Sequence, residues 1–478
     1  MERVLAILEV SQKQSYIFSS RKLKDNILRS NEIERVTGDT YLSENSCHYT
    51  TAKNMVYSGG GHTVLQFEAD TLEQARTEAA ALISDVTRAV LEDYPEMELF
   101  AKRIDYHAEQ TPAENLLHLT QALEEKKAVR KASFYTTRFG VESNAPRKTA
   151  EDFEDRERYP GWTMTADTDK MLQNSGDSFL AVVHIDGNAM GKRVQQIYEE
   201  CTESWEVCRE KLNLFSTVVD VCFKAAYNGM MNDLLSELHK MQWEGNYLPV
   251  RRIISAGDDI CFVAVGKLGF DCAASFLAHL KEQDTQGFGK AFSACAGIVL
   301  VHKKYPFRRA YDLSEALCTN AKKYAAHFSD DMCAIDWHIE YGQLKDHLMQ
   351  VREDYKTDDG NRLELRPIAL INPAQPARSY AFFTGIIRSL QGQNAALARS
   401  KIKALRGAFK QGVIESQFEI IRQSAHSLLD CIPKEYDTNH SGFMMMTEEI
   451  KPGQTEKVFR NLFFDAIEIS DRIMLWRK

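Results

Sequence analysis

Apolar runs rich in β-branched residues alternate with longer amphipathic stretches along the chain, which predicts strands and helices in turn. In the first part, strands are predicted at 4–10, on either side of the glycines in 55–67, and at 97–107. Helical periodicity is found at 15–34, 72–91 and 113–131. This mixture predicts a first domain with both helices and strands over residues 1–135.

A second unit of the same kind is predicted over residues 179–341. Its strands are expected at 178–186, 251–265, 292–302 and 333–340, and its helices from Ala189 and at 205–241, 268–283 and 307–328. Residues 136–178 are rich in charged residues and contain two prolines, so they are predicted to be a linker or an inserted loop region. Only helix patterns follow, which predicts an α-helical domain over residues 342–478. The fold class is therefore α+β.

The two mixed units align with each other as copies of one fold. LAILEVSQKQ (5–14) matches LAVVHIDGNA (180–189) without a gap, and YSGGGHTVLQF (57–67) matches ISAGDDICFVA (254–264). In this alignment, Ser11, Gly61 and His62 of the first copy stand at the positions of three aspartates of the second copy, Asp186, Asp258 and Asp259. The acidic residues are therefore expected in the second copy only.

These three aspartates predict a metal site. Asp186 ends an apolar strand, and Asp258 and Asp259 form the turn between two apolar strands, where adjacent carboxylates are unfavourable unless water or a cation compensates their charge. Three carboxylates at neighbouring strand ends suit Mg²⁺ or Mn²⁺, and two such ions activate a hydroxyl and stabilise a leaving pyrophosphate. A Gly-Asp-Asp turn alone also has a purely conformational explanation, because both residues are frequent in hairpin turns. The combination with Asp186 favours the metal site.

Small residues surround the aspartates and predict a phosphate-binding place. Asp186 is followed by a turn that opens a helix, made of Gly187, Asn188, Ala189, Met190, Gly191 and Lys192. The N-terminus of a helix attracts phosphate groups, and Lys192 in its first turn is expected to reach them. Ser255, Ala256 and Gly257 are small enough for a nucleotide to approach the backbone. His184 is expected to point to the opposite face of the strand from Asp186 and to be structural.

Composition narrows the setting of this chemistry. The net charge of −9 gives no overall positive field for nucleic acid, and no run of about 20 apolar residues predicts a membrane span. The ten cysteines include no CxxC pair, so buried free thiols and a cytoplasmic location are expected. One predicted helix carries a basic face that is a candidate contact for RNA, a triphosphate or a partner protein, formed by Arg399, Lys403, Arg406 and Lys410. An ordinary solvated helix face explains this pattern equally well.

At the acidic residues the sequence resembles a known family. IDGNAMGK (185–192) and SAGDD (255–259) resemble motifs in the second palm domain of the large subunit of type III CRISPR effector complexes, which is related to GGDEF-type cyclases and palm-fold polymerases. Residues 292–325 resemble the family's later strand and helix, and residues 10–25 resemble the opening of its first palm domain. The resemblance implies two ferredoxin-like palm domains, metal ligation by the three aspartates, and a triphosphate beside Lys322 or Lys323. It also implies conversion of ATP to cyclic oligoadenylate through 3′–5′ linkages, with release of pyrophosphate, in antiviral defence.

Departures from the family pattern leave alternatives open. Asn188 stands where the family has a second Asp, and Ala256 where it has the first Gly, which bears on the choice of base or product. No HD nuclease domain precedes the first predicted strand, so a compact relative of the large subunit is expected. A cyclic dinucleotide synthase is one alternative, and a catalytically silent scaffold or nucleotide sensor in an RNA-guided complex is another. Small CRISPR subunits and a second copy of the chain are the candidate protein partners.

Overall fold

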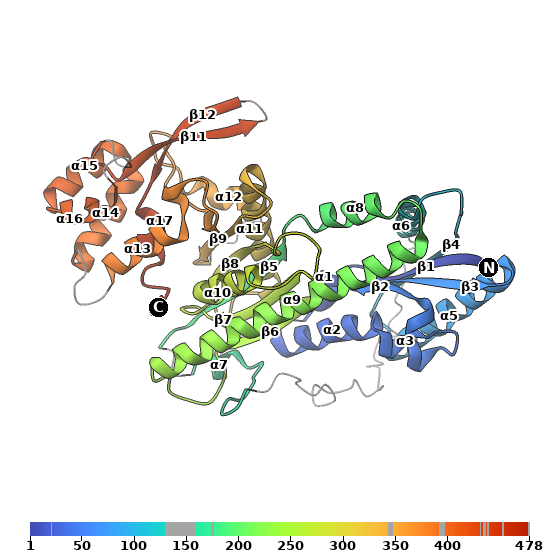
Figure 1. Ribbon diagram of the computed structural model, residues 1–478. Coiled ribbons are helices and arrows are strands. Elements are labelled where there is room, and N and C mark those ends of the chain that lie inside the picture. The colour runs from blue at the N-terminus through green and yellow to red at the C-terminus, as the bar shows by residue number, and fades with distance from the viewer. Residues whose placement is uncertain are drawn as a thin grey trace.

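The computed structural model describes residues 1–20, 22–129, 159–173, 176–342, 348–391, 397–430, 432–433, 436, 439–451 and 454–476. Figure 1 shows three parts in a row: a first sheet that contains the N-terminus, a larger central sheet, and a C-terminal part on the far side of the central sheet. The strands and helices of the first two parts agree with the predicted α+β pattern.

The first part is a four-stranded antiparallel sheet in the order β2-β3-β1-β4. Its strands are β1 (Glu2–Val10), β2 (Met55–Gly59), β3 (His62–Ala69) and β4 (Leu99–Asp105). Its helices are α1 (Lys13–Ile17), α2 (Leu23–Val36), α3 (Asp39–Asn45), α4 (Thr51–Asn54), α5 (Leu72–Asp93) and α6 (Pro112–Ala128). β1 is a central strand on which α5 and α6 pack, which explains its nearly continuous apolar run.

The second part is a six-stranded sheet in the order β10-β9-β8-β5-β7-β6. Its strands are β5 (Phe179–Gly187), β6 (Val250–Ala256), β7 (Asp259–Val265), β8 (Ala294–His302), β9 (Cys333–Glu340) and β10 (Ile368–Ile371). Its helices are α8 (Met190–Glu200), α9 (Trp205–Lys240), α10 (Gly269–Lys281) and α11 (Phe307–Phe328). Four strands, β6-β7-β5-β8, repeat the order of the first sheet, so the two parts share the ferredoxin-like βαββαβ arrangement.

The repeat is real, but the predicted alignment of its first strands is wrong by two residues. β1 places Glu9 opposite His62, whereas β5 places Asp186 opposite Asp259. The residue of the first sheet that corresponds to Asp186 is therefore Glu9 and not Ser11. Both central strands are apolar almost throughout, so a shift of two residues keeps the same faces buried and leaves the apolar pattern unchanged.

The backbone after each central strand supports this corrected alignment. Gln12 precedes α1 with a φ of 50°, and Ala189 precedes α8 with a φ of 55°, both in the left-handed region that few L residues adopt. Since these two unusual positions follow Glu9 and Asp186 by the same three residues, the first copy has kept one carboxylate at the end of its central strand.

The two sheets are held together by reciprocal helix packing, with α9 of the second part on β2 of the first and α2 of the first part on β6 of the second (Figure 1). Side chains of α9 bond to the backbone of the other part: Arg209 Nε donates to the Met55 carbonyl at 2.9 Å, and Ser216 Oγ donates to the Ser58 carbonyl at 2.7 Å. This exchange brings the turn after β2 and the turn after β6 toward the same space.

The predicted linker at 136–178 lies partly outside the described residues. Where the structure describes it, the segment contains α7 (Thr168–Met171), and Thr163 exchanges backbone hydrogen bonds with the stretch before β6, donating to the Asn246 carbonyl at 2.6 Å and accepting from Leu248 at 3.0 Å. This portion therefore packs on the second part.

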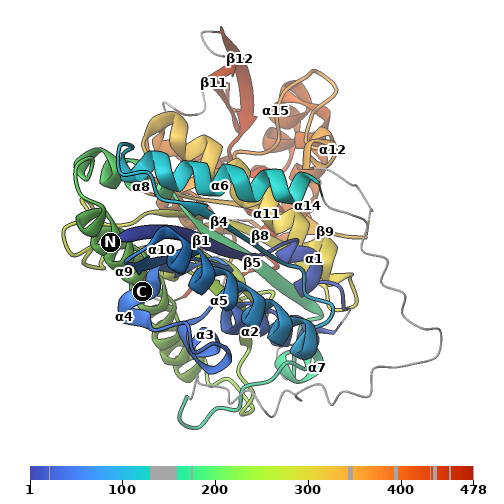
Figure 2. The ribbon, with the colours of Figure 1, turned by 90° about the vertical axis from the view of Figure 1, so that its right-hand side faces the viewer.

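The prediction that only helices follow residue 342 is wrong. The described residues of this part contain three strands in addition to its helices. The helices are α12 (Leu348–Glu353), α13 (Tyr380–Leu390), α14 (Arg399–Gln411), α15 (Val413–Arg422), α16 (His426–Leu429) and α17 (Phe464–Ile469). β10 extends the central sheet, and β11 (Phe443–Lys451) and β12 (Gln454–Asn461) form a hairpin that projects from the body in Figure 2. β10 has only four residues, and the three methionines of β11 favour helices by intrinsic propensity, so neither gave a strand pattern.

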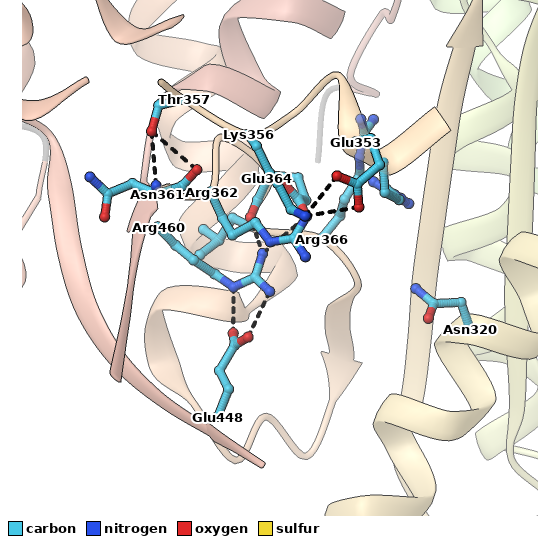
Figure 3. A network of polar contacts seen from close by, with 12 residues as sticks. Asn320, Glu353, Lys356, Thr357, Asn361, Arg362, Glu364, Arg366, Glu448 and Arg460 are labelled. Carbon is cyan, nitrogen blue, oxygen red and sulfur yellow. Dashed lines mark hydrogen bonds and ion pairs between the residues drawn. The ribbon is translucent and has the colours of Figure 1, made fainter. Parts of the chain in front are cut away.

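A buried ionic network ties the C-terminal part together (Figure 3). Arg460 of β12 pairs with Glu448 of β11, and its Nη1 donates to the Glu364 carbonyl. Arg366, whose side chain is fully buried, packs its guanidinium 4.6 Å from the ring centre of Tyr355, and its Nε lies 3.5 Å from Asp465 Oδ1. Buried charges of this kind persist only when they are paired, so the network fixes how the hairpin joins the rest of the chain.

No helix in the described part of the chain is long and apolar enough to cross a membrane. Of the nine cysteines there, eight are buried and Cys47 is exposed, and all nine are free thiols, as predicted; Cys431 lies outside the described residues.

Candidate active site

The strand pairing of β5 and β7 brings the three predicted aspartates together. Asp186 lies directly opposite Asp259, and Asp258 occupies the preceding turn, where Gly257 has a φ of 66°. The Gly187 N–H donates to the Asp258 carbonyl at 3.2 Å, and a Cβ atom at Gly187 would lie 2.9 Å from Asp258 Oδ2. Only glycine fits at position 187 without a shift of Asp258. The Asp-Gly motif and the Gly-Asp-Asp motif are therefore in direct contact with each other.

Burial and the repulsion of neighbouring carboxylates make Asp258 and Asp259 hard to ionise. Burial, followed by the charges of Asp186 and Asp259, raises the pKa of Asp258 to about 7. Burial also raises the pKa of Asp259 to about 8, with the charge of Asp186 as the next cause. Lys322 of α11 opposes both shifts, and its Nζ lies 2.5 Å from Asp186 Oδ2. Three carboxylates with one ammonium group form a site that a further cation would stabilise.

His184 does not point away from Asp186, so that prediction is wrong. Residues two apart in a strand share a face, and His184 Nδ1 lies 3.6 Å from Asp259 Oδ1. The imidazole also meets the Tyr311 ring edge-on, with 5.4 Å between ring centres. Burial lowers the pKa of His184, which keeps the imidazole neutral beside the acidic group.

The aspartate turn faces a cavity of about 660 Å³ that both sheets line. From the second part it is lined by Ser255, Ala256, Gly257, Asp258 and Asp259. From the first part it is lined by Glu9, Ser11, Lys13, Gly60, Gly61 and Lys127 among others. A volume of this size is typical of small-molecule sites, and here the site lies between two units, where such sites often form.

Only part of the predicted phosphate-binding turn has backbone N–H groups available to bind a phosphate. The N–H groups of Gly187 and Asn188 donate to the carbonyls of Asp258 and Ser293, and the Asn188 amide donates to the Met332 carbonyl at 2.8 Å. Asn188 is thus a buried link to the loop before β9. Ala189, Met190 and Gly191 form the uncapped start of α8, where backbone N–H groups remain for an anion.

The three predicted lysines are in different situations. Lys322 contacts Asp186, whereas Lys323 is exposed. Lys192 is 70% exposed and pairs with Asp330 at 2.6 Å, away from the aspartates. The structure therefore brings Lys322, but neither Lys192 nor Lys323, to the acidic group.

A divalent cation fits the chemistry of these donors. Carboxylate oxygens are the ligands that Mg²⁺ and Mn²⁺ prefer, and Asp259 Oδ1 is buried without a hydrogen-bond partner. Among the described residues, no three His, Cys, Asp or Glu side chains converge as a finished ligand set. The Lys322 ammonium supplies the positive charge beside Asp186 in this arrangement.

Sequence reasoning missed the charged residues Glu9, Lys13 and Lys127 of the first part, which share the cavity. Lys127 Nζ lies 2.9 Å from Glu9 Oε2, and Lys13 Nζ lies 3.8 Å from Glu9 Oε1. Tyr311 of α11 was also missed, although its buried ring lies 4.1 Å from that of Phe18 in the first part.

The predicted basic face lies on α14 in the C-terminal part, and half of it is paired. Arg399 forms an ion pair with Asp471 at 2.7 Å, and Arg406 with Glu468 at 3.0 Å. Lys403 and Lys410 are exposed.

Comparison with known proteins identifies the fold. Residues 179–328 match the family model of the second palm domain of Cas10/Cmr2, which confirms the resemblance predicted from the sequence. No curated protein matches the chain. Among solved structures, the apo Csm1–Csm4 cassette is 13% identical with a TM-score of 0.58, and the match covers 98% of this chain and 70% of that one. Csm1 of T. onnurineus is 14% identical with a TM-score of 0.54, covering 91% and 65%. The Csm1–Csm4 cassette in complex with one ATP is 13% identical with a TM-score of 0.55, covering 91% and 66%. At these identities the likeness concerns the fold, and the chain spans about two thirds of the length of these structures.

Proposed function

Because residues 179–328 belong to the family of Cas10/Cmr2 second palm domains, we propose that this protein is a metal-dependent nucleotidyltransferase. It joins ATP molecules into a cyclic oligonucleotide, cyclic oligoadenylate being the favoured product, as part of a CRISPR-type antiviral defence. The observation that carries the proposal is the cluster of Asp186, Asp258 and Asp259 beside a cavity large enough for nucleotides.

The residues of the second palm have separate roles in this reaction. Asp186, Asp258 and Asp259 would hold Mg²⁺ or Mn²⁺, which when bound supplies charge stabilisation for the attacking oxygen and the leaving pyrophosphate. The Lys322 ammonium group leaves Asp186 and contacts the triphosphate. The small residues Ser255–Gly257 let the nucleotide lie against the backbone. In the bond-forming step, a 3′-hydroxyl oxygen loses its proton to water and attacks an α-phosphorus. The bond from this phosphorus to the oxygen that bridges it to the β-phosphorus breaks, and pyrophosphate leaves.

ATP as the substrate is supported by relatives of the same fold. The Csm1–Csm4 cassette has been solved with one ATP, with pppApA and with cA4, at TM-scores of 0.55, 0.56 and 0.52 to this chain. By extension, the shared cavity would hold one nucleotide at each palm, so that one chain supplies both reactants. A Csm4-like subunit is a candidate partner on the same ground.

Other predicted partners stay predictions. The basic face on α14 retains Lys403 and Lys410 for RNA or a small subunit, because Arg399 and Arg406 already pair with carboxylates. Homodimerisation and a cytoplasmic location likewise stay predictions. A silent scaffold is the second candidate function, favoured by the lysine that already neutralises Asp186.

The proposal is tested by incubating the purified full chain with all four nucleoside triphosphates and Mg²⁺ or Mn²⁺, followed by mass spectrometry of the products. A metal-dependent cyclic adenylate is expected from the wild type and no product from the Asp258→Ala, Asp259→Ala variant. The mass separates a cyclic oligoadenylate from a cyclic dinucleotide.

A matched control removes another adjacent pair of carboxylates, Glu199→Ala with Glu200→Ala, which are exposed at the end of α8. This control should keep full activity. Metal-dependent ATP binding is measured on the same samples, because a missing activator would suppress product but not binding. If the wild type binds ATP no better with Mg²⁺ than the aspartate variant does, the enzyme proposal is wrong and the scaffold function takes its place.

A further inference from the structure

The first palm repeats not only the fold of the second palm but also one of its ion pairs. Lys127 of α6 contacts Glu9 at 2.9 Å, and Lys322 of α11 contacts Asp186 at 2.5 Å. The strands that precede the two helices pair in the same register, with Val10 opposite Leu99 and Gly187 opposite Ala294. Leu99 and Lys127 are separated by the same number of residues as Ala294 and Lys322, so the two pairs occupy equivalent places.

The turns of the two palms also correspond. The Val10 N–H donates to the Gly61 carbonyl at 3.0 Å, just as the Gly187 N–H donates to the Asp258 carbonyl at 3.2 Å. The first palm therefore has Gly61 at the position of Asp258, and its next residue, His62, at the position of Asp259. Burial lowers the pKa of His62 to about 4, so this imidazole is neutral near pH 7.

Lys13 occupies the space where the second palm has the carboxylates of Asp258 and Asp259. It is the first residue of α1, and its counterpart at the start of α8 is Met190. A Cβ atom at Gly61 would lie 3.0 Å from Lys13 Cε and 3.1 Å from Lys13 Cδ, so the lysine stem covers the position that corresponds to Asp258. The ammonium group donates to the Gly60 carbonyl and lies 3.8 Å from Glu9 Oε1.

The two palms thus carry opposite balances of charge at their equivalent positions. The second palm has three carboxylates and one ammonium group there, from Asp186, Asp258, Asp259 and Lys322. The first palm has one carboxylate and two ammonium groups there, from Glu9, Lys13 and Lys127. Three more charged side chains line the cavity and pair with one another, since Lys224 lies 2.8 Å from Asp220 and 3.7 Å from Glu34. A triphosphate is repelled by the first combination unless cations intervene, whereas the second combination attracts it directly.

We propose that the first palm binds its nucleoside triphosphate without a divalent cation, with the Lys13 ammonium standing where the second palm needs a metal ion. Lys13 and Lys127 contact the phosphates. Glu9 lies between the two lysines and holds both in place. The identity of the ligand as a nucleoside triphosphate rests on the proposed function, whereas the metal independence rests on the charges of the first palm alone.

The experiment measures ATP binding to the full chain by equilibrium dialysis, in excess Mg²⁺ and in excess EDTA. Two ATP molecules per chain are expected with Mg²⁺ and one with EDTA. The Asp258→Ala, Asp259→Ala variant should keep the EDTA-resistant site. Lys13→Met, which installs the side chain found at the equivalent place in the second palm, should weaken EDTA-resistant binding roughly ten- to a hundredfold.

Two further variants separate a role in binding from a role in folding. Lys13→Arg keeps the positive charge and should keep most of the EDTA-resistant binding. Lys24→Met removes an exposed lysine of the same palm and should change nothing. Thermal unfolding of each variant shows whether it is folded, and if Lys13→Met does not fold, Lys127→Met replaces it with the same expected loss.

The outcomes distinguish this inference from the proposed function. Loss of all ATP binding in EDTA, or unchanged EDTA-resistant binding in a folded Lys13→Met protein, overturns the inference even if cyclic product forms with Mg²⁺. EDTA-resistant binding that depends on Lys13 supports the inference even if the wild type makes no product.

Discussion

The close contact between Gly187 and Asp258 gives the sharpest prediction for the acidic site. In a Gly187→Ala variant, the new Cβ would lie 2.6 Å from Met190 Cε and 2.9 Å from both Cβ and Oδ2 of Asp258. Gly187 lies in a strand outside the left-handed region, so the backbone itself tolerates alanine. The consequence is therefore a local displacement, and Asp258 is the group displaced, since the methionine end can rotate away.

The magnitude follows from two opposing effects. Overpacking a close contact by one methyl group costs about 1–3 kcal/mol, whereas replacing glycine by alanine in a permissive backbone returns roughly 0.4–1 kcal/mol. A net loss of about 1–2 kcal/mol remains, which lowers the melting temperature by about 2–8 °C for a domain of this size. Activity should fall much further than stability, because the displaced group is one of the proposed metal ligands.

The assay compares Gly187→Ala with Gly191→Ala, four residues later, by thermal unfolding and by pyrophosphate release with Mg²⁺. A Cβ at Gly191 would meet nothing within 4 Å, and Gly191 lies in α8, so its replacement should stabilise the protein by up to about 1 kcal/mol. If Gly187→Ala unfolds and reacts like the wild type, the contact does not position Asp258 and the reasoning is refuted. If Gly191→Ala loses activity while gaining stability, the start of α8 lies against a phosphate group.

Two further predictions concern neighbouring residues. Asn188→Ala removes the buried amide that donates to the Met332 carbonyl, which should lower the free energy of unfolding by about 1–3 kcal/mol. The ATP affinity per folded molecule, measured by titration, should stay constant. A loss of affinity without destabilisation would instead make Asn188 a phosphate ligand. Burial lowers the pKa of His62 to about 4. Between about pH 6.5 and 4, the unfolded chain therefore binds a proton that the folded protein does not bind. The free energy of unfolding consequently falls as the pH falls through this range. His62→Gln should show a shallower fall, by up to roughly 3 kcal/mol at pH 4 in denaturant titrations, and equal slopes for the two proteins would contradict a neutral buried imidazole.

Local pattern was sufficient to predict much of the second palm. The predicted strand at 333–340 and helix at 307–328 coincide with β9 and α11. Long amphipathic helices and buried apolar strands signal themselves through their own residues. The meeting of Asp186 with Asp259 was also predictable, because Asp186 lies near the end of one apolar strand and Asp259 begins the second strand of a hairpin in the same unit.

What the sequence did not reveal depends on register and on distant contacts. The strand period alone places His184 on the same face as Asp186, and this was misjudged. The equivalence of Glu9 with Asp186, by contrast, could be seen only from the pairing of β1 with β3. The choice between Lys192 and Lys322 needed the position of Asp330, which draws Lys192 away from the site. The shared cavity needed the reciprocal packing of α2 and α9, about which neither helix carries a sequence signal.

The charge asymmetry of the two palms bears on how a single chain can direct the reaction. Two identical sites facing each other would bind their nucleotides in equivalent ways, and nothing would decide which nucleotide supplies the 3′-hydroxyl and which loses pyrophosphate. Under the two proposals above, the α-phosphate beside Asp186, Asp258 and Asp259 would be the one that a metal ion activates, while the triphosphate that contacts Lys13 and Lys127 would stay away from the metal. The nucleotide in the first palm is then the one that can only attack. If so, a duplicated fold whose copies differ by two carboxylates and one lysine would supply a direction for the proposed reaction without a second subunit.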